Sequence, residues 1–259
     1  MTPNPVKKKL TAGTPPTWPP APGPRAPSST RNGAVRAVRG ALIGMILAVA
    51  FVATAAPDAT VVVEDWSKVE VGTRGVPPGW QKQNWGSPKY DFTVLSENPG
   101  KLLRLRSEDD SSTISKEVTV DVKQFPILQW RWKAVVLPKG GDARRKETDD
   151  EAAQLYVTFP RFPSAVRSRI IAYIWDTTAP AGAIFPSQKV GTVTFLVVRS
   201  GDAELGRWMT ETRNVYEDYK RIYGEAPAEA VGGVSISLNS QNTHSRAESH
   251  FGEILFRKP

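Results

Sequence analysis

A segment near the middle of the chain alternates strictly between apolar and polar side chains. Within residues 127–137 the apolar positions are Leu128, Trp130, Trp132, Ala134 and Val136, and the polar positions between them are Gln129, Arg131 and Lys133. Successive side chains of a β-strand point to opposite faces, so this pattern is typical of an antiparallel strand with one face in a core. We therefore expect a layered β structure in which Trp130 and Trp132 are core residues.

Similar runs, with period-two or β-branched character, recur along the chain between clusters of Gly, Pro, Asn, Asp and Ser. They cover residues 61–65, 91–96, 101–107, 112–121, 127–137, 152–159, 169–175, 191–199, 206–212, 231–238 and 249–257. Runs of this kind predict strands. Only residues 214–223 have a helical pattern, because Asn214 is a suitable N-cap, Glu217 follows three residues later, and Gly224 and Pro227 come after it. The pattern predicts an all-β, two-sheet antiparallel sandwich of jelly-roll type with one short helix.

The positive charge of the chain is concentrated in its first 55 residues. The whole sequence has 34 Lys and Arg against 26 Asp and Glu, a formal net charge of +8. Residues 1–55 contain no acidic residue, and their basic residues are Lys7, Lys8, Lys9, Arg25, Arg31, Arg36 and Arg39. The rest of the chain is nearly neutral. It lacks the basic surface of a nucleic-acid-binding domain, so we expect no nucleic-acid partner.

Several classes of site are excluded by residues that are missing or rare. The sequence contains no Cys, which excludes a disulfide framework, thiolate zinc sites and a cysteine nucleophile. His244 and His250 are the only histidines, so one chain cannot form a three-His metal site. A Ser-His-Asp site is not supported either, since no Gly-x-Ser-x-Gly motif is present. We predict no catalytic residue, no metal ligand and no cofactor, with structural calcium as the alternative.

The N-terminal part of the chain has the pattern of a leader. Residues 1–39 are Pro-rich and basic and are expected to be disordered. Residues 40–57 carry no charge and have an apolar centre, followed by the small residues Ala53-Thr54-Ala55. This order predicts a signal peptide cleaved before Ala56, with an uncleaved inner-membrane anchor as the alternative. Residues 58–259 are then expected to be a single β-sandwich domain, exported to the periplasm or the extracellular space.

Groups of residues along the predicted domain carry a family resemblance. They are Trp130-Arg131-Trp132-Lys133, Asp149-Asp150, Ala152 to Phe159, Tyr173-Ile174-Trp175, Pro180-Ala181-Gly182, Val197 to Gly201, Arg213-Asn214-Val215, Asp218-Tyr219, Gly233 to Thr243 and Phe251 to Ile254. From about Glu64 to Lys258 the chain resembles an exported bacterial family catalogued as domain of unknown function 3047. The resemblance implies a β-sandwich similar to carbohydrate-binding jelly rolls, with no established activity. The family usually has acidic residues just before the Asn-Thr pair, where this chain has Asn239 and Gln241, which argues against an acidic cation site in this turn.

Aromatic side chains are the first candidates for ligand contacts, because flat rings stack on the apolar faces of sugars. Trp85 and Tyr90 lie among amides, lysines and turn-forming residues in the segment 79–90. Trp175 ends a predicted strand beside Asp176 and a Gly/Pro-containing loop. We take Trp85, Tyr90 and Trp175 as candidate ligand-binding residues, with burial in the core as the competing interpretation of Trp175.

Polar candidates lie in two segments. Asp149 and Asp150 belong to an acidic cluster before the strand expected at 152–159, where they could contact a ligand, bind calcium or pair with the neighbouring basic residues. Asn239 and Asn242 lie in a polar turn and could either line a groove or hydrogen-bond the backbone. A glycosidase would need two carboxylates across a groove, and Asp150 with Asp176 or Glu253 is one such combination.

The sequence therefore predicts an exported β-sandwich that binds a glycan or another cell-envelope component without catalysis. One alternative is a polysaccharide-acting hydrolase or lyase that uses paired carboxylates. Another is a structural or assembly protein of the envelope that presents a sheet edge to a partner. In all three cases a membrane is contacted only through the N-terminal segment.

Overall fold

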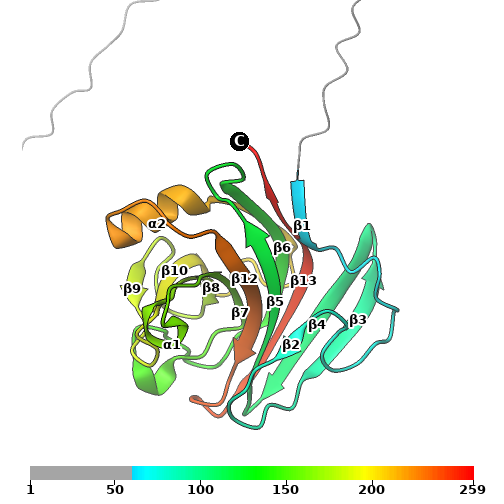
Figure 1. The fold of residues 1–259 in the computed structure, drawn as a ribbon. Coiled ribbons are helices and arrows are strands. Elements are labelled where there is room, and N and C mark those ends of the chain that lie inside the picture. Colours follow the sequence, from blue (N-terminus) through cyan, green and yellow to red (C-terminus); the bar gives the residue numbers. More distant parts are fainter. Residues whose placement is uncertain (1–59) are drawn as a thin grey trace, which may run out of the picture. The chain divides into compact units, whose positions relative to one another are not determined.

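The computed structural model describes residues 60–259, which form two β-sheets packed face to face (Figure 1). The leader expected over residues 1–39 and the apolar segment expected over residues 40–57 lie outside the described residues. The two-sheet sandwich predicted from the alternating pattern is confirmed. Among residues 60–259 no helix has the length and apolar character needed to cross a bilayer.

Sheet A has six strands in the order β11-β6-β13-β4-β3, with β1 also paired to β13. These strands are β1 (Thr60–Glu64), β3 (Asp91–Glu97), β4 (Gly100–Glu108), β6 (Ile127–Val136), β11 (Met209–Asn214) and β13 (Arg246–Arg257). All pairs in this sheet are antiparallel. The long strand β13 lies at its centre, with partners in β1, β4 and β6.

Sheet B has seven strands in the order β2-β5-β12-β7-β8-β10-β9. They are β2 (Gln81–Lys82), β5 (Ser111–Val120), β7 (Ala153–Phe159), β8 (Arg169–Asp176), β9 (Ile184–Pro186), β10 (Val193–Ser200) and β12 (Val231–Asn239). The pair β8/β10 is parallel, which the expected all-antiparallel sandwich did not include. The reason is the short strand β9, which pairs antiparallel with β10 at the sheet edge and so sets β10 in the same direction as β8.

The predicted helix is α2 (Val215–Tyr223), and its two ends form as its sequence indicates. The Asn214 side chain accepts the N–H of Glu217 at 3.0 Å, and Gly224 ends the helix at φ 74°, a left-handed conformation that glycine adopts without strain. The helix α1 (Ser164–Arg167) and a 3-10 turn at Lys146–Thr148 were not predicted. Each is about one turn long, too short to leave a periodic signal.

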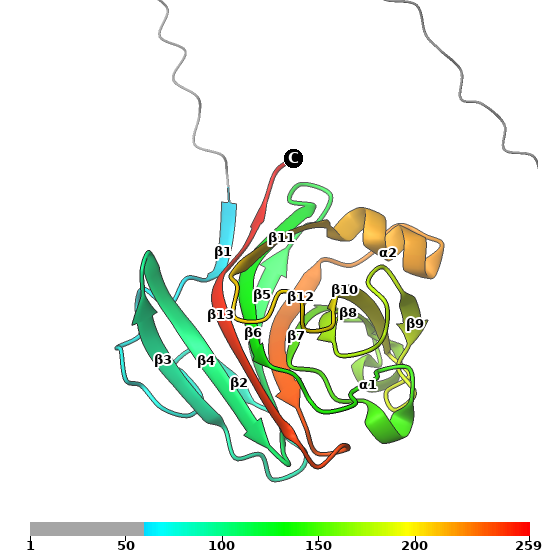
Figure 2. The same ribbon diagram turned by 180° about the vertical axis from the view of Figure 1, so that it is seen from behind.

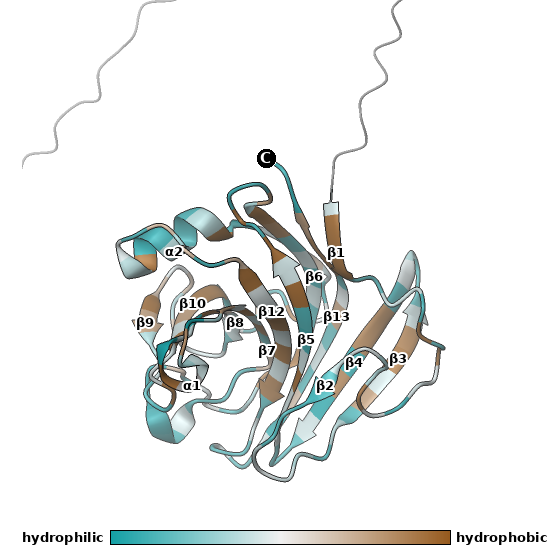
Figure 3. Ribbon diagram, viewed as in Figure 1, coloured by the Kyte–Doolittle hydropathy of each residue, from teal (hydrophilic) through white to brown (hydrophobic). Residues whose placement is uncertain are grey.

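The core between the sheets is rich in tryptophan. Trp130 and Trp132 are fully buried, as predicted, and their rings pack edge to face with centroids 5.3 Å apart. A second, smaller apolar cluster lies on the other side of β8 and β10, formed by Ala143, Ala172, Ile174, Ala179, Val193, Phe195 and Val197. Figure 3 shows the hydrophobic residues concentrated on the strands, whereas most of α2 is hydrophilic.

The two ends of the sandwich differ. The helix α2 and the C-terminal end of β13 lie at one end, and the turn between β12 and β13 lies at the other (Figures 1 and 2). The register places Ser111 opposite Asn239 and Gln154 opposite Ser237, so the start of β5, the end of β12 and the start of β7 meet near that turn.

Candidate functional site

A groove of about 180 Å³ lies on the outer face of sheet B, at the end that carries the β12–β13 turn. Core residues such as Ile114, Leu155 and Leu238 alternate with the polar residues of the same strands, so the polar side chains face away from the core. The groove is lined by Trp85, Ser111, Thr113, Asp149, Glu151, Gln154, Tyr156, Ser187, Lys189, Val190, Val193, Phe195, Ser237, Asn239 and Gln241.

Trp85 is the exposed aromatic residue of this groove, with 59% of its surface accessible. Its position is set by Gln83, whose side-chain amide donates to the Trp85 carbonyl at 2.9 Å and accepts the N–H of Thr113 at 2.7 Å. Trp85, Ser111 and Gln241 also line a second hollow of about 300 Å³. Trp85 therefore lines two adjoining hollows.

Tyr90 supports this segment and does not line the groove. Its hydroxyl accepts the N–H of Gln83 at 2.9 Å and donates to the carbonyl of Thr113 at 3.4 Å. Its ring packs edge to face against Phe92, with centroids 5.6 Å apart. Burial raises the pKa of the Tyr90 hydroxyl, so it remains a neutral donor near neutral pH. In this structure Tyr90 anchors the loop that presents Trp85.

Asn239 joins three parts of the groove through its side-chain amide. Its Oδ1 accepts the N–H of Glu151 at 2.8 Å and Nε2 of Gln154 at 2.6 Å, and its Nδ2 donates to the carbonyl of Asp149 at 2.8 Å. Asn239 is only 9% exposed. It lines the groove, as expected for a site residue, and its amide is fully engaged in holding the 149–151 segment against β12.

Asp149 and Glu151 form a buried carboxyl pair at the base of the groove, with exposures of 5% and 1%. Lys189, from the turn between β9 and β10, places its Nζ 3.1 Å from Oδ2 of Asp149 and 3.3 Å from the Asp149 carbonyl. Neither Asp149 Oδ1 nor either carboxyl oxygen of Glu151 has a hydrogen-bond partner among the described side chains and backbone. Oε1 of Gln241 is also buried and unpartnered.

Burial raises the pKa of Glu151 well above its ordinary value, and the negative charges of Asp149 and Asp176 add to the effect. Burial also raises the pKa of Tyr156, with smaller contributions from Glu151 and Asp149. The hydroxyl of Tyr156 donates to Oε1 of Gln154. The base of the groove thus combines Asp149, which pairs with Lys189, with a Glu151 and a Tyr156 whose pKa values are both raised by burial.

Asp150 and Asn242 point to the turn behind the groove. Asp150 is fully buried, and its carboxylate accepts the N–H of Asn242 at 3.2 Å and the N–H and hydroxyl of Thr243 at 2.7 and 2.8 Å. Nδ2 of Asn242 donates to the carbonyl of Lys146 at 2.7 Å. Neither residue lines the groove. Both hold the β12–β13 turn in place.

The side chains of Trp175 and Asp176 are buried and make their hydrogen bonds within the protein. Trp175 is 1% exposed, its ring lies 6.0 Å from that of Trp132, and its Nε1 donates to the carbonyl of Gly201. The carboxylate of Asp176 accepts the N–H groups of Ala143, Thr178 and Ala179. Trp175 therefore belongs to the core and leaves no ring face for a ligand.

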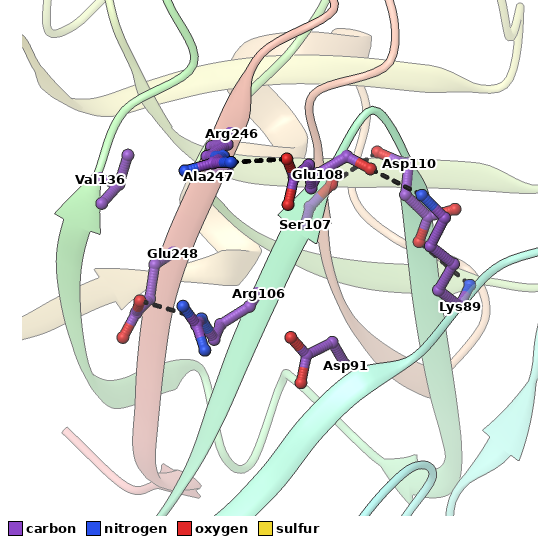
Figure 4. Close-up of a pocket in the computed structure, with 10 residues that line it drawn as sticks. All are labelled: Lys89, Asp91, Arg106, Ser107, Glu108, Asp110, Val136, Arg246, Ala247 and Glu248. Atoms are coloured by element: carbon purple, nitrogen blue, oxygen red, sulfur yellow. Dashed lines mark hydrogen bonds and ion pairs between the residues drawn. The ribbon is translucent and has the colours of Figure 1, made fainter.

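A larger hollow, of about 600 Å³, lies on sheet A (Figure 4). Its charged side chains are matched with one another: Arg106 pairs with Glu248 at 3.3 Å, and Arg246 pairs with Glu108 at 2.7 Å. The backbone N–H of Lys89 donates to Asp110. Because these charges are already paired and no aromatic ring lines the hollow, we favour the groove on sheet B as the functional site.

The groove residues that sequence reasoning missed include Glu151, Gln154, Tyr156 and Lys189. Glu151 looked like one more solvated acid in a charged segment. Lys189 comes from a hairpin turn far along the chain, and its contact with Asp149 depends on the strand order, which the sequence pattern does not encode. The polar positions of the strand expected at 152–159 were the available signal for Gln154 and Tyr156.

Solved structures with a similar arrangement are distant in sequence. The family 11 carbohydrate-binding module of the cellulosomal cellulase Lic26A-Cel5E of Clostridium thermocellum shares 7% identity over 79% of this chain and 97% of its own, with a TM-score of 0.43. The xyloglucanase domain of NopAA from Sinorhizobium fredii shares 10% identity over 79% of this chain and 99% of its own, with a TM-score of 0.39.

The xylan-binding CBM22-1 domain of Xyn10C from Paenibacillus barcinonensis shares 11% identity over 78% of this chain and 97% of its own, with a TM-score of 0.36. Similarities this distant carry no information about ligand or activity. No curated protein matches the chain significantly.

A family model matches residues 78–255, which include both sheets apart from β1 and the end of β13, as well as the whole groove. The matched family is described as a protein of unknown function, DUF3047. The resemblance expected from the sequence is confirmed, and the chain belongs to the DUF3047 family.

Proposed function

We propose that this protein is exported and that its sandwich binds a glycan in the groove on sheet B. The observation that carries the proposal is the exposed ring of Trp85 beside a groove whose base holds buried, unpartnered oxygen acceptors. A sugar ring offers both complements, an apolar face for stacking and hydroxyl groups that donate hydrogen bonds.

The proposed stacking surface is rigidly built. The side chain of Gln83 connects the Trp85 carbonyl to the N–H of Thr113, and Tyr90 ties the same segment to β5 through the carbonyl of Thr113. A ring held in place before a ligand arrives loses little conformational freedom on binding, which favours affinity. The two hollows that share Trp85 would let a chain of several sugar units lie across it.

The hydrolase alternative receives less support from this groove. Glycosidases generally hold their two carboxyl groups about 5 to 10 Å apart on either side of the scissile bond. Asp149 and Glu151 instead lie two residues apart on one segment, and both line the same small groove. Two neighbouring carboxyls on one side of a groove do not flank a glycosidic bond, so we propose binding without cleavage.

Export is proposed from the sequence of the leader. Basic residues come first, then the apolar centre of the uncharged run 40–57, and then the small residues Ala53-Thr54-Ala55 of that run. This is the order of a signal peptide, with a membrane anchor as the alternative. In either form the sandwich would face the periplasm or the extracellular space, where polysaccharides of the envelope are accessible. Alkaline phosphatase fused after residue 70 should be active in cells only if this segment is translocated.

The glycan proposal is tested with Trp85→Ala. The wild-type domain should bind at least one member of a panel of cello-, xylo-, chitin and chitosan oligosaccharides in calorimetric titrations. Trp85→Ala should lose at least about tenfold in affinity, taking the stacking of a nucleic-acid base on an aromatic side chain, worth of the order of 1 to 3 kcal/mol, as the guide to its size. The melting temperature should stay unchanged, since the ring is largely exposed.

Phe162→Ala is the matched control, because Phe162 is an aromatic residue with 89% exposure that does not line the groove. It should bind like the wild type. The proposal is wrong if no glycan in the panel binds, or if Trp85→Ala and Phe162→Ala weaken binding equally. Co-purification with an envelope complex in the absence of any sugar affinity would favour the assembly alternative.

A further inference from the structure

The carboxyl pair at the base of the groove has a specific set of free acceptors. Asp149 Oδ1, Glu151 Oε1 and Glu151 Oε2 are all buried and have no partner among the described residues. Only 1% of the surface of Glu151 is exposed, and this residue lines the groove that a ligand would fill. Oε1 of Gln241, on the opposite segment, adds a fourth unpartnered acceptor that lines the same groove.

The protein already binds one ammonium group here. Nζ of Lys189 lies 3.1 Å from Oδ2 of Asp149 and 3.3 Å from the Asp149 carbonyl, so one carboxyl oxygen of the pair is already paired with a primary amine. The other three carboxyl oxygens have no partner among the described residues. A second ammonium group has three N–H donors and a positive charge, and therefore matches these three oxygens in number and in charge.

We propose that the groove selects a glycan that carries free amino groups, with the ammonium of a hexosamine unit bound between Asp149 and Glu151. This inference rests on the proposed glycan-binding function and specifies its ligand class. Trp85 would stack on the sugar ring, and the carboxyl pair would accept hydrogen bonds from the amino substituent. N-acetylated units would be disfavoured, because an amide has one N–H donor and no charge.

A metal ion is a poorer match to the same oxygens. Calcium takes about six to eight oxygen ligands. The groove offers four unpartnered oxygens, and residues 60–259 contain no group of three or more His, Cys, Asp or Glu side chains suited to a metal. The amine of Lys189 beside Asp149 would also repel a divalent cation. Calcium is therefore an outcome of the test and is not the ligand proposed.

The charges around Glu151 predict a proton exchange on binding. Asp149 and Asp150 lie on its own segment, Asp176 ends β8, Tyr156 lies on β7, and Lys189 comes from the β9–β10 turn. Burial, together with the negative charges of Asp149 and Asp176, raises the pKa of Glu151 and so favours its protonated form when no ligand is bound. A bound ammonium would favour the ionised form, so Glu151 would release its proton to solvent as the amine binds.

The experiment compares three hexasaccharides that share a β-1,4-linked glucose backbone and differ at carbon 2. Chitosan hexamer carries an amine, chitin hexamer an acetamide and cellohexaose a hydroxyl. Calorimetric titrations at pH 6.5 should give at least about tenfold tighter binding of the chitosan hexamer than of the other two. Repeating the titration in buffers with different ionisation enthalpies should show release of up to one proton per chitosan hexamer bound.

Glu151→Gln removes the charge and keeps the size of the side chain. It should bring the three affinities to within about threefold of one another and abolish proton release, while Trp85-dependent binding of cellohexaose persists. Glu248→Gln is the matched control, because Glu248 is a partly buried carboxylate on the other sheet. It should keep the preference and the proton release. Circular dichroism and the melting temperature establish that both variants fold.

The outcomes separate this inference from the proposed function. Equal binding of all three hexamers, with loss in Trp85→Ala, would overturn the amine preference and leave glycan binding intact. Absence of binding by every hexamer would overturn both. If spermidine binds as tightly as the chitosan hexamer, the groove recognises amines without the sugar. If calcium raises the melting temperature and the chitosan hexamer does not, the carboxyl pair is a metal site. Either result would overturn the inference.

Discussion

The Nζ atom of Lys189 lies 3.1 Å from Oδ2 of Asp149, which joins the turn between β9 and β10 to the segment that enters β7. The contact crosses the parallel pair β8/β10 and closes one side of the groove. It also neutralises one of the two acidic groups at the base of the groove and leaves Glu151 without a basic partner among the described residues.

Replacement of Lys189 by Gln should strengthen binding of an amine-bearing oligosaccharide by about three- to tenfold at low salt. The substitution removes a positive charge close to the proposed ammonium position, and a charge pair near a protein surface is worth of the order of 1 kcal/mol or more. The gain should shrink as salt is raised, because the groove is open to solvent. Lys82→Gln, which removes an exposed cation outside the groove, is the control. Weaker binding by Lys189→Gln would mean that Lys189 contacts the ligand directly.

In Glu151→Gln the free energy of unfolding should fall less steeply with rising pH than in the wild type. The folded protein raises the pKa of Glu151 above its ordinary value of 4.5, so it binds the proton more tightly than the unfolded chain does. The resulting stability is complete below pH 4.5 and is lost as the pH rises through the higher pKa of the folded state. Urea unfolding of both proteins between pH 4 and pH 9 provides the measurement.

Burial lowers the pKa of His250, which contributes stability that is instead lost as the pH falls below about 6.5. This contribution is common to the wild type and Glu151→Gln, so the difference between their two curves isolates Glu151. Curves that stay parallel over the whole range would show that Glu151 has an ordinary pKa in the folded protein.

Asp150→Asn should destabilise the protein by about 3 kcal/mol. The change removes the charge from a buried carboxylate that accepts three hydrogen bonds, and it places an amide donor against the N–H of Asn242 or Thr243. Asp109→Asn, at an exposed carboxylate of the same end, should cost less than about 0.5 kcal/mol. Urea denaturation measures both. Equal effects would mean that Asp150 does not hold the turn.

Asn214→Ala should lower the free energy of unfolding by about 1 kcal/mol without changing glycan affinity. The Asn214 side chain caps α2 by accepting the N–H of Glu217, and no residue of α2 lines the groove. Thermal melts and titrations on the same preparation test both parts. A loss of affinity together with stability would indicate that the two ends of the sandwich are coupled.

Strands with one buried face could be located from the sequence, and strands without one could not. Residues 127–137 were expected as a strand and form β6 at Ile127–Val136, because alternation there reflects a real difference between core and solvent. β9 has three residues and β2 has two, so no alternation can develop. β13 starts at Arg246, three residues earlier than predicted, since its first residues include Arg246 and Glu248, which face solvent.

The candidate site could be predicted only in part, for a related reason. Trp85, Asp149 and Asn239 were selected from local sequence, and all three line the groove. These three residues come together because β12 lies between β5 and β7, and this strand order cannot be read from the sequence. The chemically distinctive residue, Glu151, differs from other acids of the chain only through burial beside Asp149, which depends on tertiary packing.

The central position of β13 orders the events of folding. β13 follows every other strand along the chain, yet it supplies the middle of sheet A and the pairing partners of β1, β4 and β6. A polypeptide that emerges from its N-terminal side, from a ribosome or through a membrane, cannot close this sheet until residues 246–257 are free. The edge of β6 that pairs with β13 stays without its partner until then, so a nascent or translocating chain would complete sheet A in one late step.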